Sequence, residues 1–318
     1  MTVSVAVLDD YGSVARDLGP WDRLDGRAEV EFLSEHLADE DALAARLEGF
    51  DVLVAMRERT PFPRSLLERL PALRLLVTTG MVNASIDLDA ARDHGVLVSG
   101  TAARGGGPVE LTWALILGLV RRIREEDAAV RAGGWQQGVG GDLEGRRLGL
   151  LGLGRLGSRV AAVGRAFGMD VVAWSANLRA EDAEAVGVTR VDRDELLRTS
   201  HVVSIHLRLS DRSRGLLGPR ELALMRPDAL LINTSRGPIV DEPALVQALR
   251  EGAIAGAGLD VFDVEPLPAN HPLRTAPRVL LTPHLGYVTE ATFRLFFEEA
   301  VQDIEAFLDG APVRLLGG

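Results

Sequence analysis

Short apolar segments of strand character alternate with segments of helical spacing along most of this 318-residue chain. Such alternation is typical of βαβ units, in which a crossover helix joins two strands of a parallel sheet. It therefore predicts an α/β fold. In the first part of the chain we expect strands at residues 3–8, 51–56, 73–78 and 96–98, and helices at 41–47, 63–70 and 87–94.

A second βαβ series begins at residue 147. A Gly-rich stretch at 99–107 precedes it and is interpreted as a crossing between domains. Pro108 then opens a helical pattern that we expect to run to about residue 132, and a last helix at 290–308 would pack back on the amino-terminal domain. The length of the chain suits two domains. The strands expected in this second series are 147–151, 171–174, 202–205, 229–232, 254–259 and 279–281.

The composition excludes several kinds of function. All 35 basic residues are arginine, so Schiff-base chemistry and a P-loop lysine are excluded, and the absence of cysteine excludes thiolate catalysis and cysteine metal sites; we predict no metal site. A net charge of −11 argues against nucleic-acid binding. The most apolar run, 111–120, is too short to span a membrane, and the amino terminus lacks a signal-peptide pattern. We expect a cytoplasmic protein without membrane or nucleic-acid partners.

A GxGxxG motif, Leu-Gly-Leu-Gly-Arg-Leu-Gly at 151–157, lies between an expected strand and an expected helix. Gly152 allows a tight turn, Gly154 lets a pyrophosphate approach the backbone, and Gly157 allows close packing of helix and strand. Arg155 and Leu156 complete the motif at the amino end of the helix, which attracts phosphate. The motif predicts a dinucleotide-binding domain.

The usual acidic residue for the ribose hydroxyl is missing at the end of the next strand. That strand end reads Trp-Ser-Ala-Asn-Leu-Arg at 174–179, with no carboxylate before Glu181. Ser175 and Asn177 can bond a hydroxyl or a phosphate, and Arg179 is a candidate phosphate contact. Both NAD and NADP therefore remain candidate cofactors.

Three stretches in the last third of the chain each place one functional side chain after an expected strand. Arg236 suits a carboxylate because its donors form a planar fork. His284 can exchange a proton, and Glu265 can orient that imidazole and bias it toward its acidic form. Together they suit reduction of a 2-keto acid. The stretches are 233–237, 263–266 and 282–284.

With these motifs the chain resembles the D-isomer-specific 2-hydroxyacid dehydrogenases along nearly its whole length. The resemblance implies that Arg236, Glu265 and His284 are catalytic, and that hydride transfer with NAD or NADP interconverts a 2-keto acid and a D-2-hydroxy acid. It also implies two Rossmann/flavodoxin-like domains with parallel sheets. The cofactor domain, 101–286, would be inserted into the substrate domain, 1–100 plus 287–318. The matching stretches are 152–157, 232–241, 256–266 and 282–286.

The resemblance assigns further residues. Asp260 would lie near the nicotinamide, and His206 and Thr234 would line the cofactor cleft. Gly80 and Met81 belong to a loop whose N–H groups would hold the substrate carboxylate together with Arg236.

Two departures from the family pattern concern specificity. His-Leu-Arg-Leu at 206–209 replaces the common His-x-Pro-Leu, and Val82 replaces a second glycine. Arg57 and Arg59 either contact a substrate side chain or form a solvated face.

The family also implies a homodimer, with the segment 108–134 and the tryptophans Trp113 and Trp135 at the seam. The alternative to an enzyme is a dinucleotide-sensing, corepressor-like protein of the same fold without turnover. A 3-hydroxyacid dehydrogenase would need a catalytic lysine, which this chain lacks.

Overall fold

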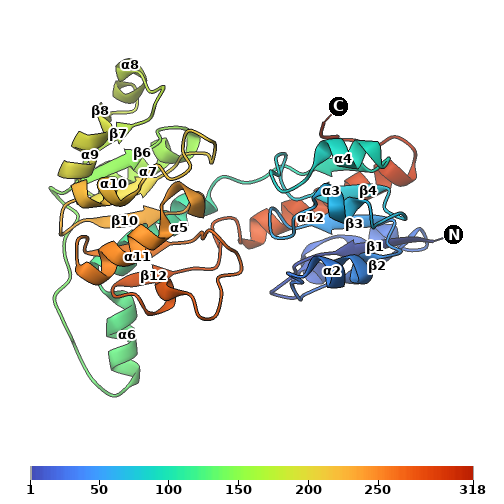
Figure 1. The fold of residues 1–318 in the computed structure, drawn as a ribbon, viewed down its shortest axis with the longest axis horizontal. Helices are drawn as coiled ribbons and strands as arrows, with labels where there is room; N and C mark the ends of the chain where they lie inside the picture. The colour runs from blue at the N-terminus through green and yellow to red at the C-terminus, as the bar shows by residue number, and fades with distance from the viewer. Residues whose placement is uncertain (1, 318) are drawn as a thin grey trace. The chain divides into compact units, whose positions relative to one another are not determined.

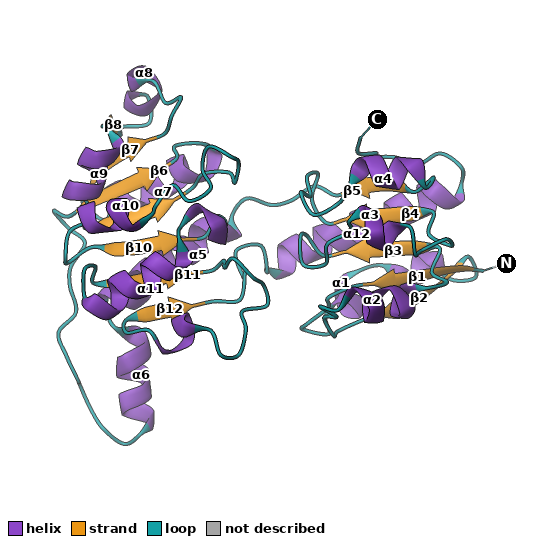
Figure 2. Ribbon diagram, viewed as in Figure 1, coloured by secondary structure: helices purple, strands orange, loops and turns teal. Residues whose placement is uncertain are grey.

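The computed structural model describes residues 2–317, and the chain divides into two compact units. Unit 1 comprises Met1–Arg104 and Val288–Gly318, and unit 2 comprises Gly105–Tyr287. Each unit contains one parallel sheet with helices packed on it (Figures 1 and 2). The predicted α/β fold with two parallel-sheet domains, one inserted into the other, is confirmed. Within residues 2–317 no helix is both long enough and apolar enough to cross a membrane.

Unit 1 is built on a five-stranded sheet in the order β2-β1-β3-β4-β5. The strand order reverses direction between β1 and β3, which places the carboxyl ends of these strands at a switch point. The strands are β1 (Val3–Val7), β2 (Ala28–Phe32), β3 (Val52–Ala55), β4 (Leu75–Thr78) and β5 (Leu97–Gly100). The helices are α1 (Ala15–Leu18), η1 (Trp21–Leu24), α2 (Glu40–Leu47), α3 (Arg64–Leu67), α4 (Leu88–Asp93) and α12 (Glu290–Leu308).

Unit 1 differs from the sequence prediction in one strand and one helix. The sequence analysis does not predict strand β2, because Ala-Glu-Val-Glu-Phe alternates buried and exposed residues at a sheet edge and lacks an apolar run. The expected helix at 63–70 is a single turn, Arg64–Leu67, preceded by Pro63.

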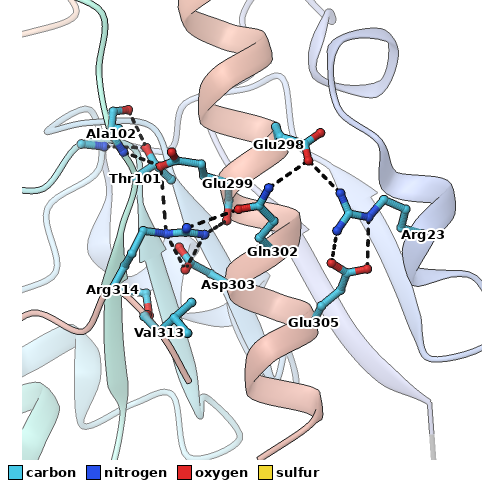
Figure 3. A network of polar contacts seen from close by, with 12 residues as sticks. Arg23, Thr101, Ala102, Glu298, Glu299, Gln302, Asp303, Glu305, Val313 and Arg314 are labelled. Atoms are coloured by element: carbon cyan, nitrogen blue, oxygen red, sulfur yellow. Dashed lines mark hydrogen bonds and ion pairs between the residues drawn. The ribbon is translucent and has the colours of Figure 1, made fainter. Parts of the chain in front are cut away.

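The long carboxyl-terminal helix α12 completes the core of unit 1. Phe296 and Phe297 are fully buried, and the ring of Phe297 lies 5.7 Å from that of Trp21. Figure 3 shows the polar side of this helix, where Arg314 bonds the buried Asp303 at 2.9 Å. On the same helix, Glu299 accepts a hydrogen bond from the backbone of Ala102 at 2.6 Å. Helix α12 is therefore bonded to the segment that leaves β5.

Unit 2 is built on a seven-stranded sheet in the order β12-β11-β10-β9-β6-β7-β8, with its switch point between β6 and β9. The strands are β6 (Arg147–Leu151), β7 (Asp170–Trp174), β8 (Thr189–Arg190), β9 (Val202–Ile205), β10 (Leu230–Asn233), β11 (Gly256–Leu259) and β12 (Val279–Leu281). The helices are α5 (Gly107–Val120), α6 (Ile123–Arg131), α7 (Arg155–Ala166), α8 (Ala180–Glu184), α9 (Arg193–Thr199), α10 (Pro219–Leu224), η2 (Gly237–Ile239), α11 (Glu242–Glu251) and η3 (Pro272–Thr275).

The prediction of one continuous helix from 108 to 132 is wrong. Arg122 adopts a left-handed conformation with φ of 55°, which ends α5 and starts α6 in a new direction. The two helices differ in environment: α5 packs its apolar side on the sheet, whereas α6 buries none of its residues and extends away from it (Figure 2). Trp113 on α5 is 6% exposed and packs on Phe167, so this tryptophan belongs to the core of unit 2.

Candidate active site

The glycine motif forms the turn from β6 into α7. A side chain at Gly152, where φ is +105°, would lie 2.6 Å from the carbonyl oxygen of His206, and one at Gly157 would overlap the carbonyl of Gly152. A Cβ at Gly154, by contrast, would meet no atom within 4 Å. The free space at Gly154 adjoins the first N–H groups of α7, which have no partner within the helix. This arrangement fits a dinucleotide pyrophosphate.

The end of β7 contains no acidic side chain that would select between the two cofactors. Ser175 is half-buried and Asn177 is exposed. Arg179 donates two hydrogen bonds to Asp182, at 2.8 and 2.7 Å. A 2′-phosphate would therefore compete with Asp182 for this guanidinium.

His206 and Thr234 lie just beyond the ends of β9 and β10. The Nε2 atom of His206 is 3.0 Å from the hydroxyl of Ser204, and burial lowers the pKa of His206 to about 4. The ring is therefore neutral near pH 7. Thr234 shares a hydrogen bond of 2.9 Å with Thr112 on α5. Both residues are thus fixed by neighbouring hydroxyl groups.

His284 and Glu265 form a direct pair. The Nδ1 atom of His284 is 2.7 Å from Oε2 of Glu265, and the other carboxylate oxygen of Glu265 accepts the N–H of Phe262 at 2.9 Å. The two side chains are 18% and 30% exposed. Because Glu265 engages Nδ1, Nε2 is the ring nitrogen left to exchange a proton with a substrate.

Asp260 holds the loop that carries His284. Its Oδ1 accepts hydrogen bonds from the hydroxyl of Thr282 at 2.6 Å and the N–H of Leu285 at 2.7 Å, and its Oδ2 accepts the N–H of Gly286 at 2.9 Å. Burial raises the pKa of Asp260, and these three bonds counter part of that rise. The loop they hold gives His284 a left-handed φ of 55°. The sequence did not predict these hydrogen bonds of Asp260, because no local pattern links it to residues more than twenty positions away.

Arg236 extends from a turn built by its neighbours. The side chain of Asn233 accepts the N–H of Ser235 and donates to the carbonyl of Arg236, both at 3.0 Å. A side chain at Gly237 would overlap the backbone at Phe262, so the Arg236 loop touches the loop that leads to Glu265. Strands β10, β11 and β12 are neighbours in the sheet, and the structure gathers the three motif loops at their carboxyl ends.

The loop after β4 in unit 1 differs in detail from expectation. Gly80, with φ of +109°, donates its own N–H to the hydroxyl of Thr101 at 3.0 Å. The guanidinium of Arg57 lies where a side chain at Gly80 would be, and it donates to the carbonyl of Thr79 at 3.0 Å. Met81 is 46% exposed. The Gly80 N–H is therefore already used, which leaves Met81 as the candidate donor of the two.

Arg59 takes a different position from Arg57. It donates to the carbonyl of Asp9 at 2.7 Å, and its guanidinium lies 4.3 Å from the ring centre of Tyr11.

No group of three or more His, Asp or Glu side chains within residues 2–317 is arranged to hold a metal ion.

Two parallel α/β units and a glycine turn that fits a dinucleotide are the architecture of a nicotinamide-dependent dehydrogenase. Residues 113–286 match the family model of the D-isomer specific 2-hydroxyacid dehydrogenase NAD binding domain. The chain belongs to this family. It is accordingly an oxidoreductase that acts on CH–OH groups with NAD or NADP and interconverts keto acids and hydroxy acids.

Named relatives agree with this assignment. A glyoxylate reductase of Aeropyrum pernix is 42% identical over 77% of this chain and 76% of its own length. A D-3-phosphoglycerate dehydrogenase of Bacillus subtilis is 35% identical over 89% of this chain, which spans 54% of that longer protein. The crystal structure of a phosphoglycerate oxidoreductase from Vibrio cholerae superposes with a TM-score of 0.93 at 36% identity, covering 98% of this chain and 100% of that one.

Proposed function

We propose that this chain is a 2-keto acid reductase producing D-2-hydroxy acids, with His284 as acid and base, Glu265 orienting it, and Arg236 binding the substrate. The observation that carries the proposal is the 2.7 Å pair of His284 and Glu265, which lies in loops adjoining that of Arg236. If the pair of His284 and Glu265 served only to stabilise the fold, the loop of Arg236 would not need to lie beside it.

The proposed roles follow from the chemistry of each group. NADH or NADPH, when bound, supplies the hydride that adds to C2 of the keto acid. Protonated His284 gives its Nε2 proton to the carbonyl oxygen, so the C=O double bond becomes a C–O single bond with a new C–H and a new O–H bond. The Glu265 carboxylate stabilises the protonated ring before this transfer. Arg236 binds the substrate carboxylate with its fork of donors and polarises the carbonyl.

We propose that the dinucleotide is held by the turn of Gly152, Gly154, Arg155, Leu156 and Gly157. In the same proposal Ser175 and Asn177 contact the adenosine ribose, and His206, Thr234 and Asp260 line the remainder of the cofactor site. In unit 1, the loop of Gly80 and Met81 is the proposed carboxylate-binding loop, with the Met81 N–H as donor.

We also propose that the chain forms a homodimer through the segment 108–134 and Trp135, of which α6 is the exposed part. Ile123 and Val130 on this helix are 55% and 53% exposed, and Trp135 beyond it is 78% exposed. Large apolar side chains that gather on one segment in this way favour a partner surface.

The test is consumption of NADH and NADPH with glyoxylate, hydroxypyruvate or phenylpyruvate, and formation of NADH and NADPH from the oxidised cofactors with D-3-phosphoglycerate. We expect His284→Ala to lower kcat by about a hundredfold or more, while cofactor affinity measured by fluorescence stays close to that of the parent. His94→Ala, at a histidine of unit 1 that is 35% exposed, is the matched control and should keep its turnover. Equal turnover in His284→Ala and parent would refute the proposed acid.

A second variant separates substrate binding from proton transfer. Arg236→Lys keeps the charge but loses the planar fork, so we expect a higher KM for the keto acid together with a lower kcat. If the parent binds cofactor but turns over no keto acid, the reductase proposal fails and the sensing protein is favoured.

A further inference from the structure

Unit 2 contains a hollow of about 730 Å³ at the edge of its sheet opposite the catalytic loops. Its lining includes Leu230, the first residue of β10, together with Ala255 and Arg278, which directly precede β11 and β12. These three strands carry Arg236, Glu265 and His284 beyond their other ends. Because the strands are parallel, the hollow and the proposed active site lie at opposite edges of the sheet. The last residues of α11, Leu249 to Glu251, belong to the same lining.

Three arginines line this hollow: Arg146, Arg250 and Arg278. Among residues 2–317 no side-chain hydrogen bond or ion pair holds any of their guanidinium groups. The two acidic residues of the lining are engaged elsewhere. Asp228 accepts two hydrogen bonds from Arg226, at 2.8 and 3.1 Å, and Glu251 accepts one from Gln247 at 2.8 Å. The lining therefore has an excess of unused positive donors, in a chain whose net charge is −11.

The backbone around the hollow is tightly packed. Arg278 has a left-handed φ of 50°, and its carbonyl accepts the N–H of Ala257 at 3.1 Å and lies directly against Gly256, where no side chain would fit. On the other side, Gly141 donates its N–H to the carbonyl of Val120 at 2.9 Å and lies beside the guanidinium of Arg146. A non-glycine residue in the left-handed conformation, as Arg278 is, stores backbone strain, and such residues concentrate at binding sites.

We propose that this hollow binds a small polyanion, an organic phosphate or a polycarboxylate, through Arg146, Arg250 and Arg278. Guanidinium groups bind phosphate and carboxylate through paired donors, and the volume lies within the range of small-molecule sites. Helices α5 and α11 also end here, and each contributes roughly half a negative charge at its carboxyl end. Arg226 neutralises Asp228, whereas Glu251 keeps its negative charge beside the uncharged Gln247. The three arginines set against Glu251 and the two half charges leave about one positive charge at the lining, which favours an anion.

The experiment is calorimetric titration of the full chain with pyrophosphate and with citrate, at ionic strength held constant with sodium chloride. We expect saturable binding of at least one probe with one site per chain, and the preferred probe identifies the phosphate or the polycarboxylate class. Arg146→Gln and Arg250→Gln should each weaken the affinity by about tenfold. Arg198→Gln, at an exposed arginine of α9, is the matched control and should bind like the parent.

Three outcomes would overturn the proposal. The first is the absence of saturable binding for both probes. Arg250 would then serve only to offset the negative carboxyl end of α11. The second is equal weakening in Arg198→Gln, which would indicate a general charge effect. The third is displacement of the probe by NADH, which would place it at the glycine motif. Thermal unfolding of each variant verifies that the fold is retained.

Discussion

At the scale of single residues, Ser175 occupies the position at which an acidic side chain would select NAD. No carboxylate is present there to repel a 2′-phosphate, and the nearby Arg179 is already paired with Asp182. We therefore expect the parent to use both cofactors, with kcat/KM values within about a hundredfold, or ~2.7 kcal/mol. Ser175→Asp should shift the preference toward NADH through charge repulsion and a new ribose hydrogen bond. Steady-state kinetics with both cofactors measures this, and a parent that rejects NADPH far more strongly would show that another residue supplies selectivity.

Gly154 and Gly157 belong to one motif but have different physical reasons to be glycine. A methyl group at Gly154 meets nothing in the chain, whereas one at Gly157 overlaps the carbonyl of Gly152. We expect Gly154→Ala to change the free energy of unfolding by less than about 1 kcal/mol and to raise the KM for NADH about tenfold or more. Gly157→Ala should instead lower the free energy of unfolding. Urea unfolding and kinetics on the two variants measure both effects; an unaltered NADH KM in Gly154→Ala would mean that the pyrophosphate lies elsewhere.

At the scale of elements, helix α12 contains a carboxyl group whose burial makes stability depend on pH. Burial raises the pKa of Asp303 from 3.8 to about 7, although Arg314 opposes the rise, and one of its carboxylate oxygens has no hydrogen-bond partner. Between these two values the folded chain keeps a proton that the unfolded chain has lost. The contribution of Asp303 to the free energy of unfolding therefore falls as pH rises from about 4 to about 7.

Asp303→Asn removes this titration. We expect the difference in free energy of unfolding, variant minus parent, to increase steadily as pH rises through that range. Urea unfolding at several pH values gives the difference, and Asp309→Asn, at an exposed position just beyond the same helix, is the control that should show no such trend. A constant difference at every pH would indicate that the Arg314 pair keeps Asp303 charged.

At the scale of the whole molecule, the exposed apolar residues of α6 and its loop predict self-association. Light scattering should give about twice the chain mass of 34.2 kDa. Ile123→Asp should produce a monomer with an unchanged circular dichroism spectrum, because a charge on an exposed face disrupts an apolar contact without disturbing the core. Val82→Ser, at a residue 73% exposed in unit 1, should remain associated. A parent with the mass of one chain would remove the dimer from the proposal.

Much of the architecture followed from signals that lie within a few neighbouring residues. The alternation of apolar and helical segments predicted the α/β fold, and the motifs at 152–157 and 232–241 indicated the family; both are confirmed. Local patterns failed where the signal was not local. Strand β2 has no apolar run because only one of its faces is buried, and the break at Arg122 depends on a single left-handed residue within a helical pattern.

The sequence by itself determined which residue types follow which strands, since periodicity, glycine and proline act on the chain nearby. Only the tertiary structure decided which of them meet. Glu265 bonds His284 across 19 residues, and Asp260 braces the His284 loop across as many as 26. Such contacts depend on the order in which parallel strands assemble into a sheet. That order is set by the packing of whole elements, so a pattern of neighbouring residues does not reveal it.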